Sequence, residues 1–252
     1  MNHPEKHMFA LYVRSLSSMK GFGRKMTEFE LHDKELWHRL TRTLRLTAGE
    51  TVTFFDSILA YDVRLSERMF SDKKLCIHGT VIQCKENEPL APLISLYICM
   101  PKKSTFEEIC YTAAQMGVTS IVPVLSEKSQ KISWTEKEHT RLERIMIAAC
   151  EQSKQFVLPS VASQCLIYDI PSNDALKLFF DAHGQNISSL VANLANASHS
   201  SIAVVIGPEG GLTRQEQDVL QKNGFLGYAL TPTILRTQDA MTVGLGILRS
   251  IS

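Results

Sequence analysis

The chain has 252 residues, of which 44% are hydrophobic and 21% are charged, and its formal net charge is +1. This balance is typical of a globular protein and argues against a disordered or low-complexity chain. No apolar run approaches the roughly 20 residues of a membrane-spanning helix, and MNHPEKHMFALYVRS lacks the long apolar segment of a signal peptide, so a cytoplasmic protein with no membrane partner is expected.

The cysteine pattern predicts neither a metal site nor a disulfide framework. No two cysteines form a C-x-x-C pair, and a chain of this length can stabilise itself by a core rather than by crosslinks. Buried free thiols are therefore the expected state. The six positions are Cys76, Cys84, Cys99, Cys110, Cys150 and Cys165.

The first part of the chain carries local positive charge. Residues 1–25 hold five Lys or Arg against Glu5 alone. A helix is expected from Asp33, which can cap it, to about Leu46, before Gly49. Its apolar face carries Leu36, Trp37, Leu40 and Leu44, and a second face carries His38, Arg42 and Arg45, with Arg39 alongside. That second face is either solvated or a cationic ridge for a phosphate backbone.

Three short β-like runs follow this helix, at residues 51–56, 60–66 and 75–83. Alternation of Val52 and Phe54 with Thr53 and Phe55 predicts a half-buried antiparallel sheet. The charged, proline-bearing stretch 84–92 is expected to be a linker. Residues 1–86 are therefore predicted to form a small β-rich domain.

Strands and helices alternate from Leu93 onwards. Apolar runs at 93–100, 118–125, 175–182, 201–207 and 226–231 read as strands. Helices are expected at 136–153 and at 104–117, where Ser104 or Thr105 would open the helix and Gly117 would close it. This alternation predicts an α/β domain with a parallel sheet over residues 92–252. Ligands bind such sheets beyond the carboxyl ends of the strands.

The stretch SIAVVIGPEGGLTRQEQDVL places a glycine-rich loop at one of these strand ends. Thr213 and Glu216 form a T-x-x-E capping box, so the three glycines of the loop are not needed as caps. Glycine permits positive φ and close approach of the backbone to a ligand. The loop is neither a Walker A nor a G-x-G-x-x-G loop, and its alternatives are a ligand slot or a tight strand-to-helix turn.

A second strand-to-helix loop carries the sequence ILRT, residues 234–237. An arginine at this position can bind a phosphate or a carboxylate through its fork of donors. Taken alone, an arginine at this position is more often an ordinary surface residue than a ligand-binding one.

Together these motifs resemble a known family. GPEGG and ILRT, with IMIAACEQSKQ at 145–155 and HRLTRTLRLTAGETVTFFD at 38–56, resemble the RsmE-type family over roughly residues 9–250. That family belongs to the SPOUT methyltransferases and methylates N3 of a uridine in small-subunit (16S) ribosomal RNA. The resemblance implies a C-terminal parallel sheet with a trefoil knot, preceded by a PUA-like β-barrel domain that helps hold RNA.

The resemblance also implies the ligands and the site residues. S-adenosylmethionine would lie bent in the knot, the partner would be small-subunit ribosomal RNA or the 30S subunit, and the protein would act as a homodimer without a metal. Arg236 would contact the substrate near the methyl group, and residues 182–184 would form a third loop beside the cofactor. The expected cofactor-binding residues are Gly207, Glu209, Gly210, Gly211, Leu230, Ile234 and Leu235. The expected RNA-binding residues are Arg14, Arg24, Lys25, Arg42 and Arg45.

Several positions depart from the family pattern. Gln238 stands where the family has a glutamate after ILRT, Gln155 stands where it has an arginine, and Leu-Thr-Pro-Thr at 230–233 lacks the usual glycine and arginine. Each change removes charge or flexibility near the expected site. Three functions therefore stay open: the uridine-N3 methyltransferase, a SPOUT methyltransferase with a shifted RNA target, and a non-catalytic RNA-binding ribosome-assembly factor.

Overall fold

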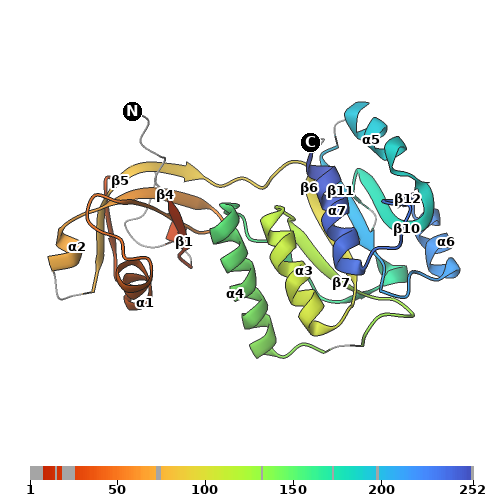
Figure 1. Cartoon of the computed structure of the whole chain (residues 1–252), viewed down its shortest axis with the longest axis horizontal. Coiled ribbons are helices and arrows are strands. Elements are labelled where there is room, and N and C mark those ends of the chain that lie inside the picture. The colour runs from red at the N-terminus through yellow and green to blue at the C-terminus, as the bar shows by residue number, and fades with distance from the viewer. Residues whose placement is uncertain are drawn as a thin grey trace. The chain divides into compact units, whose positions relative to one another are not determined.

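The computed structural model describes residues 8–14, 16–18, 26–71, 75–131, 133–171, 173–196 and 199–250. The chain divides between Glu88 and Pro89 into two compact units, called here the N-terminal and the C-terminal unit. Figure 1 labels their helices and strands in chain order. Within the described ranges, no helix has both the length and the apolar composition needed to cross a membrane.

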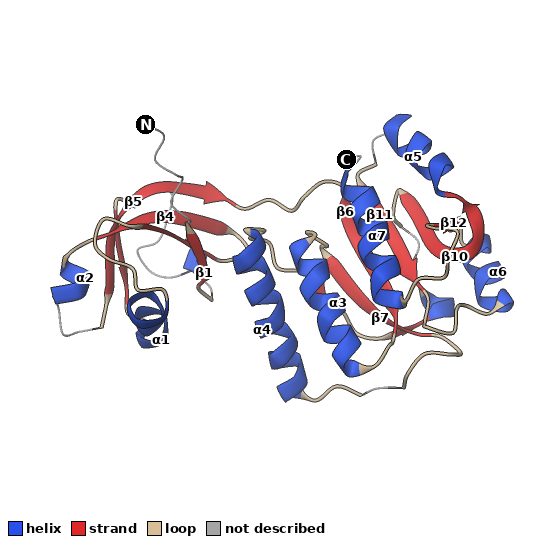
Figure 2. Cartoon of the chain, viewed as in Figure 1, coloured by secondary structure: helices blue, strands red, loops and turns tan. Residues whose placement is uncertain are grey.

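The N-terminal unit is built on a five-stranded mixed sheet with the strand order β1-β3-β4-β5-β2. β1 and β3 run parallel, and the other neighbours are antiparallel. Strands are drawn in red in Figure 2. The three predicted runs are strands, but β5 continues to Glu86, so the linker does not begin at Cys84 as expected. The strands are β1 (Phe9–Tyr12), β2 (Glu28–Leu31), β3 (Thr51–Phe55), β4 (Leu59–Leu65) and β5 (Ile77–Glu86).

The predicted half-burial of β3 is wrong. Val52, Thr53, Phe54 and Phe55 are all buried, so both faces of this strand are covered. β3 lies between β1 and β4, and the Thr53 hydroxyl donates a hydrogen bond to Asp62 Oδ1 at 2.7 Å. A threonine on an inner strand can therefore be buried without leaving its hydroxyl unpaired.

The helix predicted from Asp33 to Leu46 is shorter and irregular. Asp33 caps it as expected, accepting the Leu36 N–H at 2.9 Å, but α1 covers only Lys34–His38 and continues as a π-helical turn, η2 (Arg39–Thr43). Arg45 lies beyond it in the left-handed region, at φ 53°. The predicted row of His38, Arg42 and Arg45 is consequently not formed, because the wider π turn changes the spacing and Arg45 is outside the helix.

Asp56 organises the turn between β3 and β4. It is buried, and its carboxylate accepts the backbone N–H groups of Ser17, Ile58 and Leu59 at 2.6, 2.8 and 2.8 Å. Burial alone would raise the pKa of Asp56, but these hydrogen bonds to the charged form outweigh it and the pKa is lowered. The aspartate of the FFD segment thus has a structural role in this unit. Two short helices complete the unit, η1 (Leu16–Ser18) and α2 (Arg68–Ser71).

The C-terminal unit is an α/β fold with a parallel sheet, as predicted. Its strand order is β12-β10-β11-β6-β7-β8, with β9 also paired to β7, and every pairing between neighbours is parallel. The last three long strands of the chain are therefore adjacent at one side of the sheet. The strands are β6 (Leu93–Cys99), β7 (Ser120–Leu125), β8 (Ser160–Val161), β9 (Cys165–Leu166), β10 (Leu176–Asn186), β11 (Ser201–Ile206) and β12 (Leu226–Ala229).

Helices cover both faces of this sheet. α3, α4 and α7 lie side by side over one face (Figure 1), while α6 and η3 pack with Phe179 and Val205 on the other. α4 has the predicted bounds, but α3 begins at Lys103 rather than at a Ser104 or Thr105 cap. The helices are α3 (Lys103–Gln115), α4 (Glu136–Ser153), η3 (Ile167–Asp169), α5 (Ile187–Asn196), α6 (Arg214–Lys222) and α7 (Thr237–Ser250).

Arg249 attaches the end of α7 to the start of the C-terminal unit. Its guanidinium donates to the carbonyl oxygens of Met116 at 2.9 Å, Pro92 at 2.8 Å and Gly117 at 2.6 Å, and to that of Leu90 at 3.4 Å. Burial lowers the pKa of Arg249. Carbonyls at the beginning of β6 and the end of α3 thereby receive their hydrogen bonds from a residue more than 130 positions away.

Candidate functional site

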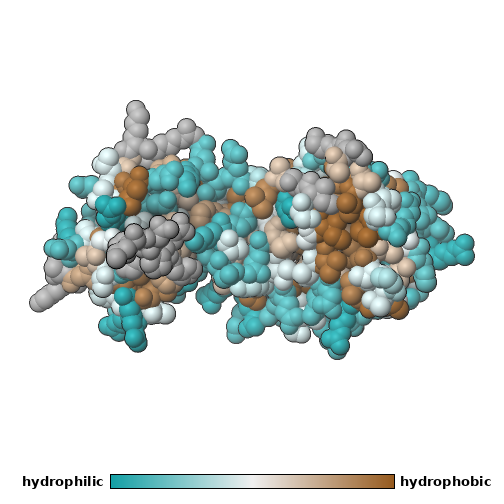
Figure 3. Space-filling view, turned by 45° about the horizontal axis from the view of Figure 1, so that its top comes forward, coloured by the Kyte–Doolittle hydropathy of each residue, from teal (hydrophilic) through white to brown (hydrophobic). Residues whose placement is uncertain are grey.

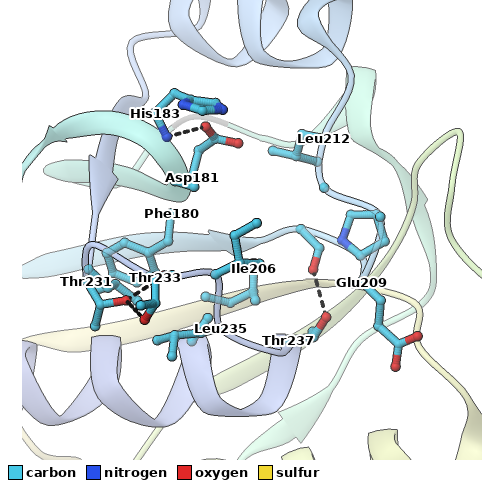
Figure 4. Close-up of a pocket in the computed structure, with 18 of the residues that line it drawn as sticks. Phe180, Asp181, His183, Ile206, Glu209, Leu212, Thr231, Thr233, Leu235 and Thr237 are labelled. Atoms are coloured by element: carbon cyan, nitrogen blue, oxygen red, sulfur yellow. Dashed lines mark hydrogen bonds between the residues drawn. The ribbon is translucent and has the colours of Figure 1, made fainter.

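A cavity of about 390 Å³ opens where the adjacent strands β10, β11 and β12 end. Its wall consists of the chain that follows β11, the last part of β10 and the chain that follows β12 (Figure 4). Parallel strands bring their carboxyl ends to one edge of the sheet, which is where such folds place ligands. The volume lies in the ordinary range of small-molecule sites, about 300–1,000 Å³.

The loop after β11 forms the cavity wall mainly with its backbone. The Gly211 N–H donates to the Pro208 carbonyl at 2.8 Å, and Gly211 has φ +70°, a conformation that glycine adopts without strain. The Thr237 hydroxyl donates to the Gly207 carbonyl at 3.3 Å and so joins the loop to α7. Figure 4 shows the Glu209 side chain directed away from the other labelled side chains, so the cavity meets the backbone of this residue.

Glu216 fixes the far end of this loop. The predicted capping box is confirmed: Thr213 Oγ1 accepts the Glu216 N–H at 3.3 Å, and Glu216 Oε2 accepts the Thr213 N–H at 2.8 Å. The other carboxylate oxygen accepts the Glu127 N–H at 2.7 Å, and Lys128 Nζ donates to the Gly210 carbonyl at 2.9 Å. The chain that follows β7 therefore supports the glycine-rich loop, although it does not line the cavity.

β10 contributes to the cavity through a bulge. Its pairing with β12 shifts register between Phe180 and Gln185. The Asp181 carboxylate accepts the His183 N–H and the Gln217 side-chain amide, both at 2.9 Å. A Cβ on Gly184 would lie only 2.6 Å from the Tyr228 backbone, so the bulge depends on a glycine here.

The chain after β12 closes the cavity from the opposite side. Leu230 and Leu235 are half-buried, whereas Ile234 is 86% exposed. The Thr231 hydroxyl donates to the Thr233 carbonyl at 2.7 Å, which keeps this short segment turned. Apolar side chains thus face a wall of peptide groups across the cavity.

A nucleophilic thiol is not part of this site. Cys99 ends β6 and is fully buried, and burial raises its pKa to about 12. A thiol in this state has almost no thiolate at neutral pH. The buried thiol of Cys99 is therefore not available as a nucleophile.

Comparison with known proteins decides the family of the chain. The RNA methyltransferase domain family matches residues 87–249. The chain belongs to the RNA methyltransferase domain family. The relationship predicted from GPEGG and ILRT is therefore confirmed.

Two relatives with similar sequences carry the same protein name. The Ribosomal RNA small subunit methyltransferase E of Aquifex aeolicus is 30% identical over 145 residues, which cover 57% of this chain and 62% of that protein. The chain thus spans less than two thirds of that relative. The protein of the same name from Synechocystis is 28% identical over 222 residues, covering 85% and 70%.

One solved structure has the same fold as this chain over nearly the whole length of both proteins. It is a Ribosomal RNA small subunit methyltransferase E from Neisseria gonorrhoeae bound to S-adenosyl methionine. Its sequence is 24% identical, the match covers 97% of this chain and 98% of that one, and the TM-score is 0.76.

The predicted site residues of this RNA methyltransferase family member fall into three groups. Those expected to bind a cofactor all line the cavity. Arg236 is exposed between two lining residues, Leu235 and Thr237, and is not itself part of the wall. Arg14, Arg42 and Arg45 are exposed on the N-terminal unit, while Arg24 and Lys25 lie outside the described residues.

Sequence reasoning missed several groups around the cavity. Lys128 and the Glu127 N–H hold the glycine-rich loop from another part of the chain, and Gln217 orients Asp181. No sequence motif predicts these contacts, because two of them involve backbone atoms, which every residue has. Asp181 could have been found from the sequence, because it is a carboxylate next to the predicted third loop, residues 182–184.

Proposed function

We propose that the protein is an S-adenosylmethionine-dependent methyltransferase that modifies N3 of a uridine in small-subunit (16S) ribosomal RNA. The observation that carries this proposal is the cavity at the ends of β10, β11 and β12 in a chain of the RNA methyltransferase domain family. The names of the relatives supply the RNA class. The uridine N3 position follows from the resemblance of the motifs.

The cavity wall fits S-adenosylmethionine. Ile206, Leu230 and Leu235 offer apolar contact to a flat purine ring, and the backbone of residues 207–211 offers hydrogen-bond donors and acceptors to the polar parts of the molecule. Asp181, held by two hydrogen bonds, places a carboxylate at the wall, where it can attract a cationic ligand. S-adenosylmethionine supplies a methyl group that the positive charge on its sulfur already activates.

The protein's own task is then to orient the uracil and to exclude water. Arg236 stands at the rim between Leu235 and Thr237, where its fork of donors can hold an RNA phosphate or a uracil oxygen. The uracil N3 must lose its proton for the methyl group to bond there. Gln238 is neutral and cannot accept this proton as a carboxylate would.

A trefoil knot in the C-terminal unit is part of the proposal. Two features support it: the chain that follows β12 passes the cavity, and α7 then packs on α3 and β11 in the middle of the sheet. The likeness to the Neisseria structure over 97% of the chain agrees with this path. A PUA-like β-barrel in the N-terminal unit is likewise proposed, on the basis of its five-stranded mixed sheet.

Exposed arginines of the N-terminal unit are proposed to contact the RNA backbone. Arg42 belongs to the π turn η2, and Arg45 lies two residues beyond it, so both can present their guanidinium groups to solvent. Arg14 is the third exposed arginine of this set. Cytoplasmic location follows from such a substrate.

A second copy of the chain is the proposed partner of α7. Figure 3 shows hydrophobic side chains gathered on the C-terminal unit where α7 lies. On this helix Val243 is exposed and Ile247 is half-buried, so both can contribute apolar contact to a partner that covers the patch. Sedimentation of the wild type and of Val243→Asp tests this: the variant should shift to the monomer, and an unchanged dimer would exclude α7 as the interface.

The decisive experiment is methyl transfer in vitro to small subunits and to naked ribosomal RNA from cells that lack the protein. Digestion and mass spectrometry should show one new methyl group on the N3 of uridine. A methyl group on another nucleoside would mean a shifted target. Failure to transfer methyl groups, together with no heat of binding on titration with S-adenosylmethionine, would leave only the RNA-binding assembly factor.

A further inference from the structure

Three side chains of types that commonly bind metal ions lie close together in the N-terminal unit. Glu30 Oε1 lies 3.3 Å from His32 Nε2, and Cys76 Sγ lies 3.7 Å from that nitrogen and 3.9 Å from that oxygen. All three distances join the same three atoms. Among the described residues, this is the cluster of His, Cys and carboxylate groups whose ligand atoms could hold a metal ion.

The register of two strands creates the cluster. β2 and β5 pair antiparallel, and the ladder ends with Leu31 opposite Ile77. Continuing this register by one residue brings His32 opposite Cys76. Glu30 and His32 are two residues apart and point to the same face. Glu30 and Cys76 are 46 residues apart in sequence, and only strand pairing brings them together. Metal-site spacing in the sequence therefore could not reveal them.

The distances within the cluster match those of a zinc site. Zn²⁺ binds sulfur at about 2.3 Å and nitrogen or oxygen at about 2.0–2.2 Å in a tetrahedral arrangement, so the ligand atoms of such a site are about 3.4–3.6 Å apart. The observed distances differ from these by about 0.3 Å or less. We propose that Glu30, His32 and Cys76 bind a Zn²⁺ ion, with water at the fourth position.

Burial and charge agree with this assignment. Cys76 is 1% exposed and approaches from the protein side, while the side chains of His32 and Glu30 are 66% and 54% exposed. The open side of the site therefore faces solvent, which can supply the fourth ligand and a route of entry. On binding, the Cys76 thiol loses its proton to solvent, and thiolate plus carboxylate balance the two charges of the ion.

The ion would join the end of an edge strand to its neighbour. β2 is an outer strand of the five-stranded sheet, and it pairs with β5 over four residues. Joining Glu30 of β2 and His32, which follows this strand, to Cys76, which directly precedes β5, should stabilise the folded unit by mass action. This role is separate from the cavity of the C-terminal unit and does not depend on the proposed methyl transfer.

Titration of the full chain with Co²⁺ tests the proposal, because a thiolate bound to Co²⁺ absorbs through sulfur-to-metal charge transfer. The wild type should gain this absorption up to one equivalent of Co²⁺, and Zn²⁺ should remove it. Cys76→Ser should lack the band, whereas Cys84→Ser, in the same unit but outside the cluster, should keep it. A wild type without the band, or a Cys76→Ser protein that retains it, overturns the proposal.

Exposed variants keep the test independent of folding. Glu30→Gln should weaken Zn²⁺ binding at least about tenfold, and the rise in melting temperature on adding Zn²⁺ should shrink accordingly. Glu28→Gln is the matched control, since Glu28 lies on the same exposed face of β2 and outside the cluster. Equal affinities for the two variants would show that the three side chains merely hydrogen-bond to one another.

Discussion

Replacing Glu216 by alanine should destabilise the C-terminal unit much more than the same replacement of Glu138. Both residues complete a capping box, Glu216 with Thr213 on α6 and Glu138 with Thr135 on α4. Glu216 is fully buried and also accepts the Glu127 N–H, whereas Glu138 lies near the surface and pairs with Lys103. The two sites thus differ in burial and in the number of backbone groups that depend on the carboxylate.

The size of the effect follows from the groups left without a partner. Glu216→Ala removes the acceptor of two N–H groups, those of Thr213 and Glu127, at 2.8 and 2.7 Å. A hydrogen bond to a charged group contributes about 1.5–3 kcal/mol. Because Glu127 is exposed and Thr213 is half-buried, water can replace part of what is lost, so the expected loss in the free energy of unfolding is about 2–3 kcal/mol. Water can replace the carboxylate of Glu138, so its loss should be much smaller.

Urea unfolding monitored by Trp134 fluorescence measures this difference. A Trp37→Phe background removes the other tryptophan of the chain and leaves a reporter in the C-terminal unit. Glu216→Ala should also weaken binding of S-adenosylmethionine, because the loop that it anchors forms the cavity wall. Equal losses of stability for Glu216→Ala and Glu138→Ala would refute the assigned role of the buried carboxylate.

Three further predictions concern single groups. Arg236→Ala should lower methyl transfer at least about tenfold while cofactor affinity changes less than about twofold; Arg214→Ala is its control, and an equal loss of both properties would place Arg236 in the cofactor site. Asp56→Asn should destabilise the N-terminal unit at pH 7 but not well below pH 4. The pKa of Asp56 is lowered in the folded state, so its carboxylate stabilises the fold above the pKa of the unfolded state, about 3.9, and this stabilisation is lost as the pH falls through the folded-state pKa. Urea unfolding at both pH values measures this, and a pH-independent difference between wild type and variant would contradict it. Changing Arg42 and Arg45 together to alanine should lower the salt dependence of RNA binding by about 1.4–1.8 in logarithmic slope, and an unchanged slope would make them ordinary surface residues.

Much of the C-terminal unit could be predicted because its signals are local. The bounds of α4 and the capping box of α6 depend on residues a few positions apart, and the structure has both. Strands alternating with helices were enough to predict the parallel sheet. The loops after β11 and β12 were predicted as a site for the same reason, since each follows an apolar run directly.

Features set by distant partners escaped prediction. The alternation in β3 suggested one solvated face, yet Thr53 is buried on this inner strand, and its hydroxyl is satisfied by Asp62 of the next strand. The π turn in η2 and the left-handed conformation of Arg45 depart from the regular 3.6-residue period on which the predicted helix was based. The bulge of β10 depends on the approach of Gly184 to Tyr228, two segments far apart in sequence.

Arg249 has a consequence for the order in which the protein is made. The carbonyl of Gly117, which it binds, is synthesised 132 residues before it, an interval of roughly 7–26 s at the usual rates of translation. During this time the carbonyls that later accept from the guanidinium lack this donor and can bond to water instead. They belong to Leu90, Pro92, Met116 and Gly117. The first strands of the C-terminal unit can therefore pair while the chain is still being synthesised. The hydrogen bonds to Arg249 form only after α7 has left the ribosome.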